Sequence, residues 1–299
     1  MDLRVIGAPM DLGADRRGVD MGPSAIRYAG LSDAVRSIGY SYDDTGDLPV
    51  PRPEGRDPNS ERPERGEAKY LRETRWVCRR VESAVADAID SGALPLVLGG
   101  DHSIAIGSVG GASTDRAVGV LWLDAHADFN TPETSPSGNV HGMPVAAMLG
   151  RGQFADESWA TADIEAENVA MVGLRDVDDE EGAALRDSDV TAYTMSDVDA
   201  RGLVSIVETA LDEALEGVDA LHVSLDMDFL DPNEAPGVGT PVRGGVTYRE
   251  AHTAMERIAE TGAVRSMEVV EVNPILDSHN RTAELVVELV ASALGKRIL

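Results

Sequence analysis

Six continuous apolar runs recur along the 299 residues, and segments with helical spacing lie between them. Short apolar runs without polar alternation are typical of strands that are buried on both faces of a sheet. Their alternation with helices favours an α/β fold with a parallel sheet that is covered on both sides. The predicted strands span residues 3–8, 94–98, 118–123, 169–173, 220–225 and 266–270.

The helical segments and one long loop complete the pattern. The predicted helices span residues 71–89, 197–215 and 247–260. Thr247 and Glu250 have the spacing of a capping box at the start of the last of these helices. Residues 49–67 are rich in Pro, Arg and Glu, which predicts an exposed loop. Because the strand–helix pattern resumes unchanged after this loop, we expect a single domain over residues 1–299.

Side chains that can bind metals follow two of the predicted strands. Asp124, His126 and Asp128 come directly after the third strand. Asp226 and Asp228 come directly after the fifth strand. Because residues i, i+2 and i+4 of an extended segment point to one side, the members of each set share a face.

A third segment, Gly-Gly-Asp-His, places His102 after the second predicted strand. In parallel α/β sheets, ligands bind beyond the carboxyl ends of the strands. All three segments lie at such ends, so we expect their side chains to converge on one site. The predicted metal ligands are His102, Asp124, His126, Asp128, Asp226 and Asp228.

The charge of this set indicates what it binds. Four buried aspartates are costly unless cations compensate them, and two divalent ions would neutralise the four charges. A bridging hydroxide would then leave one negative charge, which suits a cationic substrate. Nitrogen and oxygen ligands without thiolate favour manganese and similar ions over structural zinc. Taken alone, His102 is more simply a loop histidine, and Asp231 with Pro232 a turn.

Composition excludes several classes of partner. The chain carries 26 basic and 53 acidic residues, a formal net charge of −27. Nucleic acids and anionic membranes require concentrated Lys and Arg, so we expect neither as a partner. No signal-like segment begins the chain and no apolar run approaches transmembrane length, which predicts a cytoplasmic protein. Cys78 is the only cysteine and is predicted to be a small core residue.

These motifs, with several others in the same order, resemble the arginases of the ureohydrolase superfamily, close to the bacterial type. The resemblance covers nearly the whole chain and includes Asp-Ala-His-Ala-Asp, Ser-Leu-Asp-Met-Asp and Glu-Val-Asn-Pro. It implies a three-layer α/β/α fold around a mostly parallel sheet of about eight strands. It also implies two Mn²⁺ ions per subunit and a homo-oligomer, a trimer or a hexamer. The matching segments are residues 6–10, 16–23, 99–103, 124–128, 130–144, 173–178, 237–241 and 270–274.

The resemblance further implies how the ligands divide between the ions. One ion takes His102, Asp124, Asp128 and Asp226. The other takes His126, Asp124, Asp226 and Asp228, so that Asp124 and Asp226 bridge.

By the same resemblance, the reaction is hydrolysis of L-arginine to L-ornithine and urea, by attack of a metal-bridging hydroxide on the guanidinium carbon. Asp128 accepts a hydrogen bond from the hydroxide, His141 shuttles protons, and Glu271 binds the guanidinium. Without this context, Glu271 would be a solvent-facing acid and His141 a loop histidine. The implied substrate contacts are Asn130, Ser135, Ser137, Asn139, Asp178 and Thr240, together with Glu271.

Three positions depart from the family pattern or vary within it. Ser135 stands where threonine is common and keeps the hydroxyl, and Ala127 stands where glycine or alanine occurs. Phe229 replaces a frequent glycine, and its bulk is expected to alter the local backbone.

Two alternatives stay open from the sequence. An agmatinase or related ureohydrolase would use the same metals but needs no reader of an α-carboxylate. A non-catalytic regulator that binds arginine or metal would be expected to lack a ligand or the histidine at position 141, and none is missing.

The dispersed acidic residues and the presence of only two lysines predict a surface adapted to high salt, where screening reduces self-repulsion. An ordinary acidic surface is the alternative. We expect circular dichroism to report loss of structure in dilute buffer and recovery in multimolar salt. Retained folding and activity in dilute buffer would count against salt adaptation.

Overall fold

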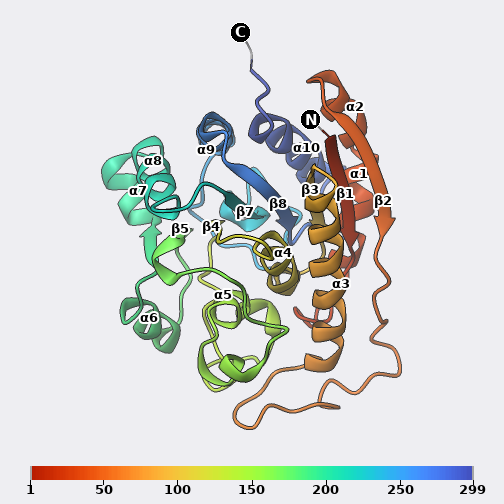
Figure 1. The fold of residues 1–299 in the computed structure, drawn as a ribbon, viewed down its shortest axis with the longest axis vertical. Helices are drawn as coiled ribbons and strands as arrows, with labels where there is room; N and C mark the ends of the chain where they lie inside the picture. Colours follow the sequence, from red (N-terminus) through yellow and green to blue (C-terminus); the bar gives the residue numbers. More distant parts are fainter. Residues whose placement is uncertain (1, 298–299) are drawn as a thin grey trace.

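The computed structural model describes residues 2–297, in which eight parallel strands form one sheet. The strand order is β2-β1-β3-β8-β7-β4-β5-β6, with β2 and β6 at the edges. Figure 1 shows β2 beside β1 at one of these edges. This topology confirms the predicted α/β class and the parallel sheet. The strands are β1 (Asp2–Ala8), β2 (Ser41–Asp47), β3 (Ala93–Gly99), β4 (Gly119–Leu123), β5 (Val169–Leu174), β6 (Thr191–Thr194), β7 (Leu221–Asp226) and β8 (Val264–Val270).

Helices cover both faces of this sheet and so make the predicted three layers. One face packs against α1 (Gly22–Tyr28), α2 (Leu31–Ser37), α7 (Met195–Arg201), α8 (Leu203–Ala214), α9 (Tyr248–Thr261) and α10 (Arg281–Ala293). The other face packs against α3 (Leu71–Asp90), α4 (Ala105–Ala112), α5 (Pro144–Met148) and α6 (Asp179–Arg186). No helix among the described residues is long and apolar enough to cross a membrane.

All six predicted strands are present, each within two residues of its expected bounds. The sequence did not predict the two edge strands. β2 is mostly exposed and carries three aspartates, and β6 has only four residues, so neither contains a continuous apolar run. Edge strands pair on one side only, and polar or short edges discourage pairing with other chains.

The helix predictions are confirmed in part. α3 and α9 match residues 71–89 and 247–260, and Thr247 forms the expected capping box with Glu250. The prediction of one helix over 197–215 is wrong, because α7 and α8 are separate helices. They meet at Gly202, whose φ of 82° interrupts the helical backbone. Residues 49–67 form a loop without helix or strand, as expected.

The order of the strands positions the site. β7 and β8, which come last in the chain, lie between β3 and β4. The carboxyl ends of these four central strands therefore meet at one edge of the sheet, and segments that are far apart in sequence become neighbours there.

Gly173, near the end of β5, has a φ of 106° and leaves room for a neighbouring ring. An added Cβ would lie 2.5 Å from Cδ2 of Phe229 and 2.9 Å from the backbone oxygen of Asp124. We expect Gly173→Ala to lower the free energy of unfolding by roughly 3 kcal/mol, because overpacking and backbone strain add.

Gly30→Ala is the matched control in urea unfolding. Gly30 has a φ of 95° and no atom within 4 Å of an added Cβ, so only the backbone penalty of about 1 kcal/mol applies. Equal losses in the two variants would contradict the role given to the packing of Phe229.

Candidate metal centre

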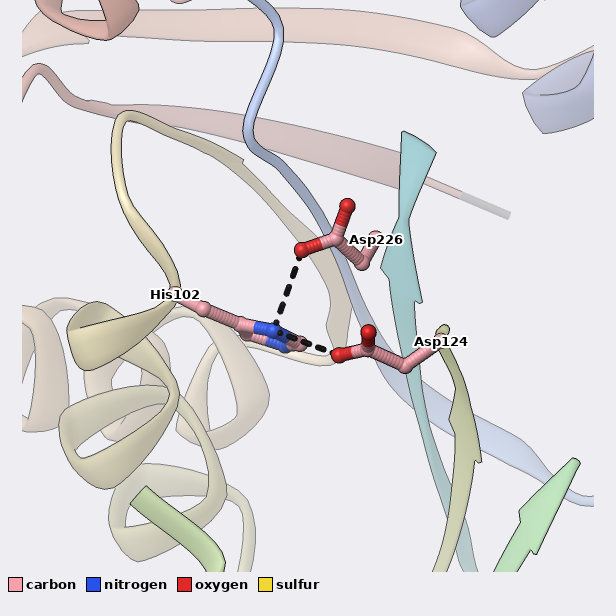
Figure 2. A group of neighbouring side chains, drawn as sticks. All are labelled: His102, Asp124 and Asp226. Atoms are coloured by element: carbon pink, nitrogen blue, oxygen red, sulfur yellow. Dashed lines mark ion pairs between the residues drawn. The ribbon is translucent and has the colours of Figure 1, made fainter. Parts of the chain in front are cut away.

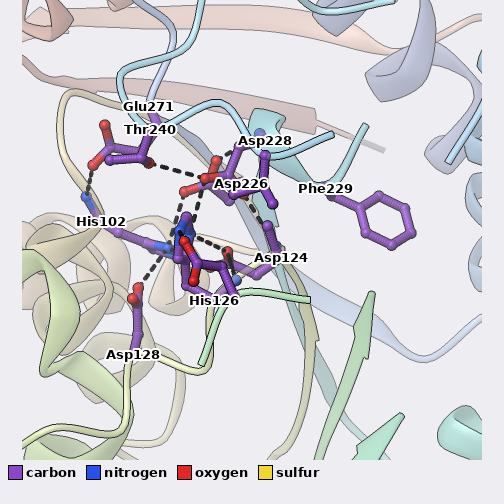
Figure 3. A network of polar contacts seen from close by, with 12 residues as sticks. His102, Asp124, His126, Asp128, Asp226, Asp228, Phe229, Thr240 and Glu271 are labelled. Carbon is purple, nitrogen blue, oxygen red and sulfur yellow. Dashed lines mark hydrogen bonds and ion pairs between the residues drawn. The ribbon is translucent and has the colours of Figure 1, made fainter. Parts of the chain in front are cut away.

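The six predicted ligands lie together at the carboxyl ends of β3, β4 and β7 (Figure 3). All are buried except His126, whose side chain is 24% exposed. Within residues 2–297, two groups of side chains could each hold an ion: His102 with Asp124 and Asp226, and Asp124 with His126 and Asp228. Asp124 is common to both groups.

The first group centres on Nδ1 of His102 (Figure 2). This nitrogen lies 3.0 Å from Oδ2 of Asp124 and 3.4 Å from Oδ2 of Asp226. It also lies 3.0 Å from Oδ2 of Asp128, which places that aspartate beside the group. Nδ1 is buried and has no hydrogen-bond partner with acceptable geometry among the described residues. A cation at this point would give the nitrogen a partner.

The second group centres on Nδ1 of His126. This nitrogen lies 3.0 Å from Oδ2 of Asp228 and 3.5 Å from Oδ1 of Asp124. The backbone supports the carboxylates, because the amide of His126 donates to Oδ1 of Asp124 at 2.7 Å and that of Ala125 donates to Oδ1 of Asp228 at 3.1 Å. The second group is therefore held by its own loops as well as by the strands.

Charge crowding dominates the electrostatics of the cluster. Burial and the carboxylate of Asp124 raise the pKa of Asp128 to about 6. Burial and neighbouring carboxylates also raise the pKa of Asp226 and of Asp228. Burial opposes ionisation of Asp124 too, but the neighbouring rings of His102 and His126 outweigh it and lower its pKa. Without added positive charge, the cluster holds protons on carboxylates or on histidines. The donor set and the unpartnered Nδ1 of His102 fit divalent cations.

Two site residues have left-handed backbone conformations that residues other than glycine rarely adopt. Asp128 has a φ of 50° and Glu271 a φ of 62°. A backbone hydrogen bond restrains each of them: Val145 donates to the carbonyl of Asp128, and Glu271 donates to that of Gly100. Strained residues of this kind persist where the surrounding structure enforces them, commonly at functional sites.

A cavity of about 200 Å³ adjoins the cluster. Its lining includes the predicted residues Asn130, His141, Asp178 and Thr240, together with the metal-type ligands His126, Asp128 and Asp226. Nδ2 of Asn130 donates to Oδ2 of Asp178 at 2.9 Å, and Thr240 donates to Oδ2 of Asp228 at 3.0 Å. The cavity thus joins predicted substrate contacts to predicted metal ligands.

Glu271 is buried beside the cluster, so the alternative of a solvent-facing acid is wrong. Its Oε1 lies 3.1 Å from Nδ1 of His141 and accepts the backbone N–H of His102 at 3.1 Å. Burial alone would raise the pKa of Glu271, but His141 lowers it below its ordinary value. The ring of His141 is partly exposed and reaches solvent.

Ser135 and Ser137 make contacts within their own loop, and Asn139 contacts a distant segment. Ser135 accepts from the amide of Gly138 at 3.0 Å, and Ser137 accepts from that of Asn139 at 3.1 Å. Asn139 accepts from Lys69 at 3.0 Å. Their substrate roles stay predictions.

Two residues of the site were missed from the sequence. Trp122 donates from Nε1 to Oδ2 of Asp124 at 3.0 Å and stacks on His102 with ring centroids 4.0 Å apart. The sequence did offer a signal for Trp122: it stands two residues before Asp124, and residues two apart on a strand lie on the same face. Glu181, on α6, lines the cavity, and burial raises its pKa to about 7. No sequence signal links α6 to β4.

Phe229 does not displace the ligands. Its side chain is fully buried and points away from the cluster (Figure 3), while Asp228 keeps its contact with His126. The absent side chain of Gly173 makes room for the ring. The bulk of Phe229 is therefore accommodated in the core, and its ring does not enter the site.

Fold and site together define a class of protein, a parallel α/β protein with a carboxylate–histidine metal centre at the carboxyl edge of its sheet. The model of the Arginase family matches residues 1–295. The arginase of Bacillus subtilis (strain 168) is 47% identical over 300 residues, covering 99% of each chain. The chain belongs to the arginase family.

Solved structures agree with this family. An arginase from Bacillus cereus matches with a TM-score of 0.91 at 44% identity and covers 100% of both chains. An Entamoeba histolytica arginase, solved in complex with L-ornithine, matches with a TM-score of 0.86 at 29% identity, covering 99% of this chain and 98% of that chain. The resemblance inferred from the motifs is therefore confirmed at the level of family and fold.

We expect Mn²⁺ to raise the melting temperature of the metal-free protein, because a cation relieves the crowded carboxylates. Free Mn²⁺ at 100 times Kd adds about 2.7 kcal/mol to the free energy of unfolding, which corresponds to roughly 4 °C for a chain of this size. Asp226→Asn should reduce the shift by at least half in calorimetry.

Asp219→Asn is the charge-matched control, since that side chain is 86% exposed at the amino end of β7. It should keep the full shift. An unchanged shift in Asp226→Asn would contradict a cation between His102 and Asp226.

Proposed function

We propose that this protein hydrolyses L-arginine to L-ornithine and urea with two Mn²⁺ ions. One observation carries the proposal: a single cavity is lined both by metal-type ligands and by polar side chains suited to the charged α-groups of an amino acid. The high identity to proteins named arginase over the whole chain supports the same reaction.

The two ions would be held by His102, Asp124, His126, Asp128, Asp226 and Asp228. Asp124 is common to both groups of the structure, and the family resemblance implies that Asp226 is shared as well. Divalent cations in such a centre generate a nucleophile from water near neutral pH and stabilise developing negative charge. The shared position of Asp124 between the two groups supports a binuclear centre.

Glu271 would bind and orient the guanidinium group. Its buried carboxylate uses Oε1 for two donors, and no hydrogen bond within residues 2–297 ends on Oε2. A carboxylate fixes the plane of a guanidinium through charge-assisted hydrogen bonds. Orientation matters because resonance makes the guanidinium carbon a poor electrophile.

Asp128 and His141 would manage protons. Asp128 lines the cavity beside His102, and this position supports a role as acceptor of a hydrogen bond from the attacking group. His141 lies at the partly exposed side of the cavity, where its ring can take protons from solvent and deliver one to the departing amine.

The α-ammonium and α-carboxylate groups of arginine would bind at the side of the cavity away from Glu271. Asp178 suits the α-ammonium as a carboxylate acceptor, and the hydroxyls of Ser135 and Ser137 suit the α-carboxylate. Asn130 contacts Asp178 and so links the two ends of this region. Asn139 and Thr240 complete the proposed set, Thr240 through its contact with Asp228.

Three further features belong to the proposal. We propose that residues 1–299 form one catalytic domain, that the protein acts in the cytoplasm, and that it assembles as a trimer or hexamer. The observation behind the first is that all strands of residues 2–297 join one sheet. The others stay predictions.

A kinetic comparison of arginine, agmatine and guanidinobutyrate tests the substrate. We expect arginine to have a kcat/KM roughly 10–100-fold higher than agmatine, because each charge-assisted hydrogen bond to the α-carboxylate contributes about 1.5–3 kcal/mol. Faster turnover of agmatine would replace the proposed substrate, and no urea release with any metal would favour a binding protein.

The same assay tests the residue roles. Asp128→Asn and His141→Ala should each lower kcat roughly 100-fold, as expected for loss of a charge-stabilising group and of a proton-transfer group. Asp219→Asn again serves as control. Wild-type rates in both site variants would show the assigned roles to be wrong.

A further inference from the structure

A row of buried polar side chains lies on one face of the sheet, next to the metal-type cluster. It comprises His222 and Ser224 on β7, and Ser266 and Glu268 on β8, none more than 1% exposed. The strand register pairs His222 with Ser266 and Ser224 with Glu268. Because positions two apart on a strand share a face, all four side chains lie on one face of the sheet.

The contacts run from this row to His102. Nε2 of His102 lies 2.7 Å from Oγ of Ser224, and Ser224 donates to Oε1 of Glu268 at 2.8 Å. Nε2 of His222 lies 3.6 Å from the same Oε1, and its Nδ1 lies 2.7 Å from Oγ of Ser266. The nitrogen of His102 that faces away from the aspartates is thus connected to a buried carboxylate.

The number of hydrogens decides the direction of these bonds. A serine hydroxyl has one hydrogen, and Ser224 gives it to Glu268. The oxygen of Ser224 can then only accept from His102, so Nε2 of His102 must carry a hydrogen. In a neutral imidazole, Nδ1 then carries none and presents its lone pair.

We propose that Glu268 and Ser224 are positioning residues that hold His102 in the Nε2–H tautomer, with the lone pair of Nδ1 directed at the carboxylate cluster. The inference rests on the proposed metal centre, but it is independent of which substrate is hydrolysed. Partners of this kind fix the tautomer and orientation of histidines that bind metals.

Two further observations support this assignment. Trp122 stacks on the ring of His102 at an interplanar angle of 9°, which restrains the plane of the ring. Oε2 of Glu268 and Nε2 of His222 are buried without hydrogen-bond partners among the described residues. Apolar side chains in such an interior are often at least as stable as buried charged groups, so packing alone does not explain this carboxylate.

The test measures Mn²⁺ affinity by electron paramagnetic resonance in Ser224→Ala and Glu268→Gln. In Glu268→Gln the side-chain amide can donate to Ser224, which frees the hydroxyl to donate to His102 and favours the wrong tautomer. We expect Kd to rise roughly 10–100-fold in both variants.

The ¹⁵N spectrum of histidine in the metal-free protein at alkaline pH gives an independent readout. Alkaline pH is needed to make the ring of His102 neutral, because the surrounding aspartates outweigh burial and raise its pKa well above the ordinary value. The signals of His102 are identified by their absence in His102→Gln. We expect Nε2 to be protonated in the wild type and the Nδ1–H form to grow in Glu268→Gln. The wild-type spectrum tests the proposal even if a variant folds poorly.

Ser292→Ala is the matched control, since Ser292 makes a buried contact of the same kind, 2.9 Å from Nδ1 of His252, away from the site. It should bind Mn²⁺ as the wild type does. Wild-type affinity in both Ser224→Ala and Glu268→Gln, or a neutral His102 ring protonated on Nδ1 in the wild type, would overturn the inference. A lack of arginine hydrolysis with these shifts intact would instead overturn only the proposed function.

Discussion

Four aspartates within reach of two histidines, almost wholly removed from water, form an arrangement that is unfavourable without added positive charge. Burial and mutual repulsion oppose ionisation of Asp226 and Asp228, and the histidines compensate only in part. Hydrogen bonds from the surroundings stabilise the carboxylates of the cluster despite this cost. Backbone amides donate to Asp226 and Asp228, and Trp122 donates to Asp124. A site with this composition is organised for cations before any cation is bound.

The topology of the sheet supplies the rigidity that such a cluster needs. β7 and β8 lie between β3 and β4, so the ligands that follow β3, β4 and β7 are anchored in one continuous run of hydrogen-bonded strands, in which β8 separates β3 from β7. The same strands carry the buried row through Ser224 and Glu268 that ends at His102. The site therefore has a cavity on one side and a polar support on the other, and both depend on the same strand register.

Much of the fold and of the ligand set could be predicted, because strongly apolar runs and closely spaced ligands are local signals. β2 and β6 could not be predicted from apolar runs, since an exposed edge strand needs none. The break at Gly202 was missed because an apolar helical pattern continues across it. Glu181 was missed because its proximity to β4 arises only when α6 packs beside the cavity.

The sequence by itself determined the class of fold, the family and the six side chains of the metal-type centre. It did so because continuous apolar runs, closely spaced ligands and the order of motifs are properties of the chain alone. Only the tertiary structure decided that Glu271 is buried beside His141, that Asp128 and Glu271 adopt left-handed backbone conformations, and that His102 contacts Ser224. These features require contacts between segments more than 100 residues apart or a backbone held by its surroundings, and neither is encoded locally.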